Sequence, residues 1–255
     1  MDYILIMMYI YAFIIGICIA SFINVVVYRV PLKLDFVKGR SFCPHCHNDL
    51  KPYDMIPIFS WIFLKGKCRF CKAPISMRYP LVEFTGGVLG VLIFHQFQFS
   101  WNTLFVFVFA MGLLAIALID FDTMLIPNGL VIFCMICAII SVFLNMEVEM
   151  LDRILAIFIV SVPMLFINFI VNDSFGGGDI KLMAVCGFML GWQKILLAMF
   201  IGILLAGTYA IALMVRKKVD RKDHIAFGPY LCMGIFVALM YGGDIIHSYL
   251  SLFGM

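Results

Sequence analysis

Residues 153–190 set the character of the chain. They read RILAIFIVSVPMLFINFIVNDSFGGGDIKLMAVCGFML, two apolar segments joined by a stretch with three glycines and an aspartate, Gly176-Gly177-Gly178-Asp179. Glycine-rich backbone weakens a helix and exposes peptide groups, so beside a bilayer it persists where it lines a cavity or approaches another group closely. An ionisable residue next to such backbone marks a candidate functional site. Asp179 is therefore a candidate catalytic acid, and it requires a partner.

The composition of the chain is that of a membrane protein. Of its 255 residues, 64% are hydrophobic and 13% are charged, which lies outside the range of soluble domains. Since a spanning helix needs about 20 mostly apolar residues, we expect an all-α polytopic membrane protein with about eight transmembrane helices, or seven if the short sixth segment is re-entrant or interrupted. The expected helices cover residues 3–27, 81–99, 102–119, 125–145, 153–172, 180–193, 195–215 and 227–250.

The basic residues predict how these helices are oriented. Of 18 Lys and Arg residues, ten lie within residues 29–78 and five within residues 216–222. Positively charged loops stay in the cytoplasm, so both clusters are expected there, with the N-terminus and the acidic turn at 147–152 outside. Following the helices from one cluster to the other places Asp120 and Asp179 on the same, cytoplasmic, face of the membrane.

The first helix is expected to remain in the protein as an anchor. It lacks a basic segment before it and is longer than the apolar core of a cleaved signal peptide. Asn24 within this helix predicts a polar contact with a neighbouring helix, and Arg29 is expected to extend to the cytoplasmic surface. The net charge of +3 is explained by topology, so we expect no nucleic-acid partner.

Two Cys-x-x-Cys pairs lie in the one sizeable polar stretch. Cys43 and Cys46 are separated by 21 residues from Cys68 and Cys71, a spacing typical of structural zinc sites with four thiolates. Paired disulfides are the alternative, and the reducing cytoplasm argues against them. The neighbouring histidines, His45 and His47, are alternative ligands, which four cysteines make unnecessary.

Other polar residues have simpler explanations. The third cysteine pair, Cys134 and Cys137, lies in an apolar segment, where cysteine packs as a small hydrophobic residue. Glu83, near the start of the second helix, is expected in its first turn, where it complements the positive helix end.

Asp120 and Asp122 end the third helix, followed by a proline at 127. Taken alone, this pair indicates a solvated turn at the membrane surface. The presence of Asp179 on the same face favours a second interpretation, in which Asp120 and Asp179 act together. Two neighbouring carboxylates share a proton, so that the ionised one activates water and the protonated one donates to a carbonyl oxygen or leaving amine. This chemistry hydrolyses peptide bonds without a metal.

Several motifs together resemble those of the type IV prepilin leader peptidases, members of the GxGD family of membrane aspartic proteases. The resemblance covers essentially the whole chain, with departures at Ala20 and Ala226, where glycine and proline are common. The motifs are Ser21-Phe22-Ile23-Asn24-Val25-Val26 with Arg29 and Pro31, the doubled Cys-x-x-Cys, Tyr79-Pro80 with Glu83, Ile119-Asp120 with Ile126-Pro127, Gly176 to Leu182, and Phe227-Gly228-Pro229-Tyr230.

The resemblance implies an endopeptidase that removes a short basic leader, after a glycine, from prepilins and pseudopilins at the cytoplasmic side of the bacterial inner membrane. By motif position, Asp120 and Asp179 correspond to the catalytic pair, and Asp122 does not. Many members with the cysteine module also methylate the new N-terminal amine with S-adenosylmethionine. The expected cofactors are therefore structural zinc and, for methylation, S-adenosylmethionine, and membrane lipid is the other expected partner.

Two other functions are kept as alternatives. An ion-coupled transporter also uses acids within the membrane, but it places them near the middle of facing helices rather than at helix ends. A zinc-bearing membrane scaffold leaves both acids unexplained. The division that we expect is a first transmembrane helix at 1–28, a cytoplasmic zinc-binding module at 29–80 and a transmembrane aspartic peptidase bundle at 81–255.

Overall fold

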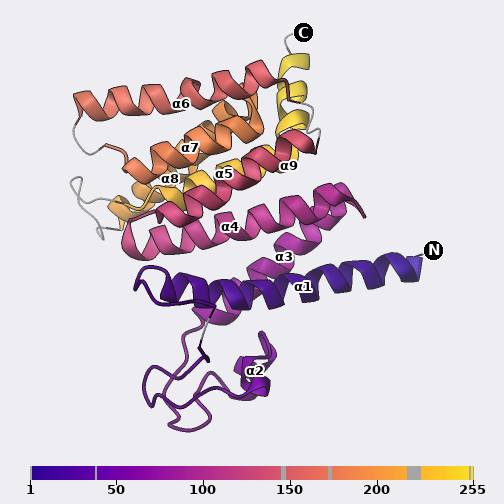
Figure 1. The fold of residues 1–255 in the computed structure, drawn as a ribbon, viewed down its shortest axis with the longest axis vertical. Helices are drawn as coiled ribbons and strands as arrows, with labels where there is room; N and C mark the ends of the chain where they lie inside the picture. The colour runs from indigo at the N-terminus through magenta and orange to yellow at the C-terminus, as the bar shows by residue number, and fades with distance from the viewer. Residues whose placement is uncertain are drawn as a thin grey trace. The chain divides into compact units, whose positions relative to one another are not determined.

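Helices form wherever the sequence is apolar for long enough, because only a helix satisfies its own backbone inside a bilayer. The computed structural model describes residues 2–37, 39–144, 148–171, 174–216, 225–252 and 254, and within them it contains helices and isolated β-bridges but no strand. The helices, shown in Figure 1, are α1 (Asp2–Arg29), the 3-10 helix η1 (Pro52–Met55), α2 (Phe59–Phe63), α3 (Arg78–Phe97), α4 (Trp101–Thr123), α5 (Asn128–Phe143), α6 (Met150–Ile170), α7 (Gly177–Leu190), α8 (Trp192–Val215) and α9 (Gly228–Ser251).

The expected all-α membrane fold is confirmed. Each of the eight expected helices corresponds to one long helix, α1 or one of α3 to α9. Six of these are long and apolar enough to cross a membrane, whereas α5 and α7 are shorter, with 16 and 14 residues. Two boundaries near the acids differ from the prediction. The helix α4 continues through Thr123 rather than ending at 119, and α7 begins at Gly177 rather than at 180.

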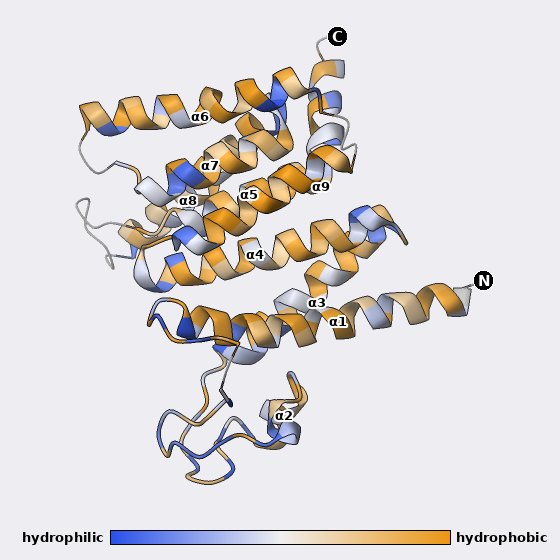
Figure 2. Ribbon diagram, viewed as in Figure 1, coloured by the Kyte–Doolittle hydropathy of each residue, from blue (hydrophilic) through white to orange (hydrophobic). Residues whose placement is uncertain are grey.

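Apolar side chains cover the outside of the helices. Figure 2 shows predominantly hydrophobic helices, with hydrophilic residues gathered at helix ends and in the segment around α2. Large apolar side chains such as Phe169 and Phe200 are 86% and 60% exposed, and lipid tails would cover them in a membrane. The acidic residue at 147 and the second basic cluster from 217 onward lie outside the described residues.

The chain divides into two compact units, residues 1–111 and 112–255, and the boundary falls within α4. In the first unit, small residues let α1 and α3 approach closely. Gly16 and Ala20 on α1 face Gly86 on α3, and a side chain at Gly86 would collide with both. Gly90 lies against the backbone of α1 in the same way. Small residues four apart on facing helices are the usual means by which membrane helices pack.

Glycines have the same role in the second unit. Gly187 of α7 lies against the carbonyl oxygen of Ala156 in α6, and Gly234 of α9 lies against that of Ala198 in α8. The buried Arg153 of α6 also joins three helices. Its guanidinium donates hydrogen bonds to the hydroxyl of Ser141 in α5, at 2.9 Å, and to the carbonyl oxygen of Phe188 in α7, at 3.2 Å.

Three predictions about polar residues of the first unit have different outcomes. The interhelical contact of Asn24 is confirmed, since its amide donates to the carbonyl oxygen of Tyr79 at 3.3 Å. The surface position of Arg29 is wrong: it is 7% exposed because the following segment folds over it and supplies carbonyl oxygens at Asp35 and Arg40, both at 2.9 Å. The first-turn position of Glu83 is also wrong, because α3 begins earlier, at Arg78.

Candidate active site and metal site

Asp120 lies in the last turn of α4 and is buried. Only 4% of its surface is exposed, and its Oδ2 accepts a hydrogen bond of 2.9 Å from the backbone N–H of Gly228. Gly228 is the first residue of α9, so the positive end of a helix approaches this carboxylate. A side chain at position 228 would place its Cβ 2.6 Å from the same oxygen. The hydrogen bond between Gly228 and Asp120 therefore requires a residue without a side chain at position 228.

Asp179 lies in the first turn of α7 and is also buried, with 7% of its surface exposed. Its Oδ2 accepts a hydrogen bond of 3.3 Å from the backbone N–H of Gly176, the residue that precedes the helix. Its Oδ1 is buried and has no hydrogen-bond partner among the described residues. A buried polar atom without a partner is rare and calls for an explanation such as a catalytic role or a bound water.

The two carboxylates lie close enough for their charges to interact. Cys232, one turn into α9, is close to both. A ring contact joins the residues that precede the two glycine donors: Phe175 and Phe227 have centroids 5.7 Å apart. The two segments that donate hydrogen bonds to the acids therefore contact each other, and the structure brings together Asp120 and Asp179, which the sequence placed on one membrane face.

Sequence reasoning did not identify the donor to Asp120. Gly228 entered the sequence analysis only within the motif Phe227-Gly228-Pro229-Tyr230, which resembles a motif of the type IV prepilin leader peptidases. The available signal was a glycine directly before a proline at a helix start, where the backbone N–H groups of the first turn are free to bind an acceptor. Nothing in the sequence indicates which acceptor that is.

The glycines beside Asp179 have different surroundings. A side chain at Gly178 would place its Cβ 2.8 Å from the Cβ of Ile126, in the segment that follows α4. Position 177 has no atom within 4 Å of such a Cβ. Gly178 thus allows α7 to pack against the segment after Asp120, while Gly177 borders open space. Both belong to the first turn of the helix rather than to the glycine-rich connection that the sequence indicated.

The other charged residues near the pair point elsewhere. Asp122 is exposed, as expected two residues from the buried Asp120, because that step turns the helix by about 200°. The ammonium group of Lys181 donates a hydrogen bond of 3.2 Å to the side-chain oxygen of Asn128, at the start of α5.

The two Cys-x-x-Cys pairs of the first unit fold into matching turns. In the first, the N–H of Cys43 donates to the carbonyl oxygen of Asn48, and the N–H of His47 donates to that of Cys43. The second repeats the pattern with Cys68 as donor to Ala73 and Lys72 as donor to Cys68. The fourth residue after each first cysteine, His47 or Lys72, has a positive φ, 55° or 60°.

These turns bring the four cysteine sulfurs together. The Sγ atoms of Cys43, Cys46, Cys68 and Cys71 all lie within 4.8 Å of one another, an arrangement that could hold a metal ion. The distance from Cys43 to Cys71 is 3.9 Å, close to the sulfur–sulfur edge of about 3.8 Å that a tetrahedron with zinc–sulfur bonds of about 2.3 Å requires. All nine cysteines are free, so the alternative of disulfides is not found.

The backbone of the second turn favours a thiolate ligand. Hydrogen bonding from the backbone N–H of Cys71, with help from Phe70, lowers the pKa of the Cys68 thiol to about 7. Residues that precede this turn in the chain also hold it in place. The guanidinium of Arg69 contacts the buried carboxylate of Asp54 at 2.7 Å and lies over the ring of Tyr53. The donor set of four thiols suits zinc, which takes four thiolates in structural sites.

Comparison with known proteins divides the chain into two matched segments. A family model described as the bacterial peptidase A24 N-terminal domain matches residues 14–97. A second model, described as the type IV leader peptidase family, matches residues 107–211. The first segment contains the four cysteines, and the second contains both Asp120 and Asp179.

Similar proteins match over nearly their full length. The chain is 32% identical to the prepilin leader peptidase/N-methyltransferase of Stutzerimonas stutzeri, with 94% of this chain and 93% of that one aligned. It is 30% identical to the protein of the same name from Aeromonas hydrophila, with 94% and 93% aligned. With the protein of that name from Bacillus subtilis it shares 32% identity over 94% and 97%. No solved structure matches the chain.

Proposed function

The chain belongs to the type IV leader peptidase family, and we propose that it is a membrane aspartic endopeptidase with Asp120 and Asp179 as its catalytic pair. Its substrates in this proposal are type IV prepilins and pseudopilins, from which it removes a short basic leader after a glycine. The observation that carries the proposal is the buried pair of carboxylates, each held by a glycine N–H at the start of a helix. The alternative of an ion-coupled transporter finds no support in these relatives.

The two acids divide the chemistry between them. The N–H of Gly228 and the positive end of α9 favour the ionised form of Asp120, which we assign as the base that takes a proton from the attacking water. Asp179 is assigned as the acid, because its buried Oδ1 has no partner among the described residues. A protonated Oδ1 donates to the carbonyl oxygen of the scissile bond as the water oxygen attacks its carbon.

The proposed place of the substrate is beside Gly177. This position borders open space next to the catalytic Asp179, and an extended peptide backbone can approach a glycine more closely than any other residue. The leader of a prepilin lies next to the apolar segment that follows it, so a site at the end of membrane helices suits a bond at the membrane surface.

The cysteine module is proposed to bind one structural zinc ion through Cys43, Cys46, Cys68 and Cys71. The four cysteine sulfurs lie within 4.8 Å of one another, and a zinc ion that takes all four as ligands has no position left for a substrate. A segment this short buries little apolar surface, so metal binding is expected to supply much of its folding free energy.

The family and the apolar helices make this a multi-pass protein of the inner membrane. We further propose that the N-terminus lies outside and that the metal module and the acid pair face the cytoplasm, because most basic residues lie within 29–78 and 216–222. The proposed functional parts are the anchor helix at 1–28, the metal module at 29–80 and the peptidase bundle at 81–255.

The relatives' names also include N-methyltransferase, and we propose that this chain methylates the new N-terminus of the cleaved substrate. S-adenosylmethionine is the proposed methyl donor. Both activities then act on the same substrate in order, since the amine to be methylated exists only after cleavage.

The peptidase proposal is tested by expressing the chain with a prepilin in cells and following leader removal by immunoblot. Asp120→Asn and Asp179→Asn are each expected to reduce cleavage by about 100- to 10,000-fold, the usual effect of removing an acid or base catalyst. Asp122→Asn is the matched control, because this acid is exposed two residues away. Leader removal that persists in either of the first two variants contradicts the assignment of the pair.

A further inference from the structure

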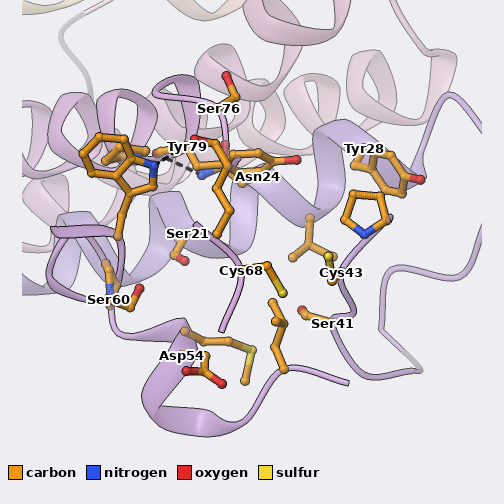
Figure 3. Close-up of a pocket in the computed structure, with 18 of the residues that line it drawn as sticks. Ser21, Asn24, Tyr28, Ser41, Cys43, Asp54, Ser60, Cys68, Ser76 and Tyr79 are labelled. Atoms are coloured by element: carbon orange, nitrogen blue, oxygen red, sulfur yellow. Dashed lines mark hydrogen bonds between the residues drawn. The ribbon is translucent and has the colours of Figure 1, made fainter. Parts of the chain in front are cut away.

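A cavity of about 700 Å³ lies within the first unit. Its walls come from residues 18–29 of α1, residues 41–76 of the cysteine module and residues 79–83 at the start of α3. Figure 3 shows Asn24 and Tyr79 on one side of this space and Cys43 and Cys68 on another. Cavities of this volume hold nucleotide-sized ligands, and the peptidase pair does not use it.

One wall of the cavity carries a buried carboxylate. Glu83 is 8% exposed, and its Oε2 accepts a hydrogen bond of 2.7 Å from the backbone N–H of Ile58 in the module. The hydroxyl of Ser21 on α1 is a second donor. Among the described residues no Lys or Arg forms an ion pair with Glu83. A buried carboxylate is costly without a positive partner, so a cationic ligand in the cavity would stabilise it.

Aromatic rings and an amide complete the lining. Tyr28, Trp61 and Tyr79 all border the cavity, and the indole N–H of Trp61 is fixed by a 3.1 Å hydrogen bond to the carbonyl oxygen of Ile75. Aromatic faces stack on planar heterocycles and attract cations. The amide of Asn24 supplies further hydrogen-bonding capacity beside them.

A ligand that fits this lining has a positive charge, a planar ring system and several polar groups. S-adenosylmethionine combines a sulfonium and an ammonium group with a purine and a ribose. We propose that this cavity binds S-adenosylmethionine, with the carboxylate of Glu83 facing its positively charged end and the aromatic residues holding its purine. This inference rests on the proposed methyltransferase activity and gives that activity a place in the chain.

The proposed methyl-donor site and the proposed peptidase site lie in different parts of the sequence. The cavity residues, 18–83, fall within the segment matched by the N-terminal domain model, 14–97, whereas both catalytic acids fall within 107–211. The cysteine module forms one wall of the cavity, which gives the metal a second consequence. Loss of the metal is expected to open the cavity as well as to unfold the module.

The transfer itself needs no further reagent. The uncharged N-terminal amine of the cleaved substrate forms a bond to the methyl carbon through its lone pair. The bond from that carbon to sulfur breaks, and its electron pair stays on sulfur, which becomes a neutral thioether. The positive charge of the sulfonium thus ends on the methylated amine, so atoms and charge balance. Glu83 takes part only in binding.

The location is tested first by photolabelling. The purified full-length chain in detergent is irradiated with 8-azido-S-adenosylmethionine, and the labelled peptides are identified by mass spectrometry. Label within residues 18–83 that excess S-adenosylmethionine suppresses is the expected result. Label within residues 112–255 that excess S-adenosylmethionine suppresses overturns the proposal. The proposal is also overturned if a basic prepilin leader peptide suppresses the labelling at a lower concentration than S-adenosylmethionine does, because the cavity is then a peptide-binding site.

The role of Glu83 is tested by calorimetric titration of S-adenosylmethionine. Glu83→Gln is expected to weaken binding at least tenfold, the usual effect of losing a contact with a charged partner. Glu149→Gln is the control, because Glu149 is exposed and lies outside the cavity. Equal affinity in wild type and Glu83→Gln contradicts the role of Glu83. If the wild-type preparation cleaves prepilin but does not bind S-adenosylmethionine, the proposed binding site is wrong and the peptidase assignment is unaffected.

Discussion

The backbone N–H of Gly228 lies 2.9 Å from Oδ2 of Asp120, although 108 residues separate the two in the chain. The contact makes the start of α9 part of the candidate active site. The family model that contains both acids ends at residue 211, so this donor lies beyond the matched segment. A contact so close to the proposed base can be tested by adding a single methyl group.

Gly228→Ala is expected to reduce prepilin cleavage by at least about 100-fold, because the added Cβ would lie 2.6 Å from the Asp120 carboxylate and must displace it. The measurement is the cleavage rate of the purified variant. Gly243→Ala in the same helix is the control, since no atom lies within 4 Å of a Cβ there. Comparable rates for the two variants contradict a role for the Gly228 contact.

Gly178→Ala is expected to lower thermal stability as well as activity. Its Cβ would lie 2.8 Å from the branched Cβ of Ile126, so α7 has to move away from the segment after α4. Crowding of this kind costs about 1–3 kcal/mol. Gly129→Ala, in the first turn of α5 and without neighbours, serves as the control in thermal unfolding. An unchanged melting temperature for Gly178→Ala contradicts the close packing of Gly178 against Ile126.

Cys68→Ser is expected to abolish metal binding, because the remaining three thiols cannot complete a tetrahedral site. The purified wild-type protein should contain about one zinc ion per chain, measured by mass spectrometry of the metal. Cys134→Ala is the matched control, from a pair with the same spacing that is buried in α5. Wild-type protein that lacks zinc, or full zinc content in Cys68→Ser, contradicts the proposed ligand set.

Zinc uptake by the metal-free protein is expected to decline as the pH falls below about 7. The lowered pKa of the Cys68 thiol keeps this ligand ionised above that value. Acidification returns the proton and removes the ligand, so affinity falls as the pH is lowered through 7. The pKa of the Cys71 thiol is raised to about 11 by desolvation and by the other cysteine thiols, so affinity also continues to rise above pH 7. Competition with a zinc-binding dye between pH 8 and pH 5 gives the measurement. Constant affinity across this range contradicts the role of the Cys68 thiolate.

Arg153→Met is expected to lower the free energy of unfolding by about 2 kcal/mol or more, because it leaves the buried hydroxyl oxygen of Ser141 and the partly buried carbonyl oxygen of Phe188 without their donor. The melting temperature in detergent reports the change. Arg216→Met, at an exposed position after α8, is the control for loss of a positive charge. Equal melting temperatures indicate that Arg153 does not hold the three helices together.

The long helices could be predicted because a single property, apolar length, determines them. Each of the eight expected segments is a helix. Errors occur where contacts between separate segments of the chain, rather than apolar length, decide the surroundings of a residue. Arg29 is buried because the segment after α1 folds back and supplies carbonyl oxygens to it. The first turn of α7 includes Gly178, which lies against Ile126 in the segment after α4.

The pairing of the acids was predictable in outline only. Charge bias places Asp120 and Asp179 on one membrane face, and in the structure the two carboxylates lie close enough for their charges to interact. The glycine donors, the unpartnered Oδ1 of Asp179 and the ring contact between Phe175 and Phe227 depend on three-dimensional packing. No periodicity in the sequence encodes them, and their catalytic roles stay predictions until the variants are measured.

The contact of Gly228 with Asp120 also has a consequence for the order in which the protein is made. Synthesis proceeds from the N-terminus, so both acids enter the membrane before the residue that holds one of them. The cavity bordered by residues 18–83 is encoded entirely within the first third of the chain. A nascent chain can therefore complete its proposed methyl-donor site early, whereas its peptidase stays inactive until the last helix has been inserted.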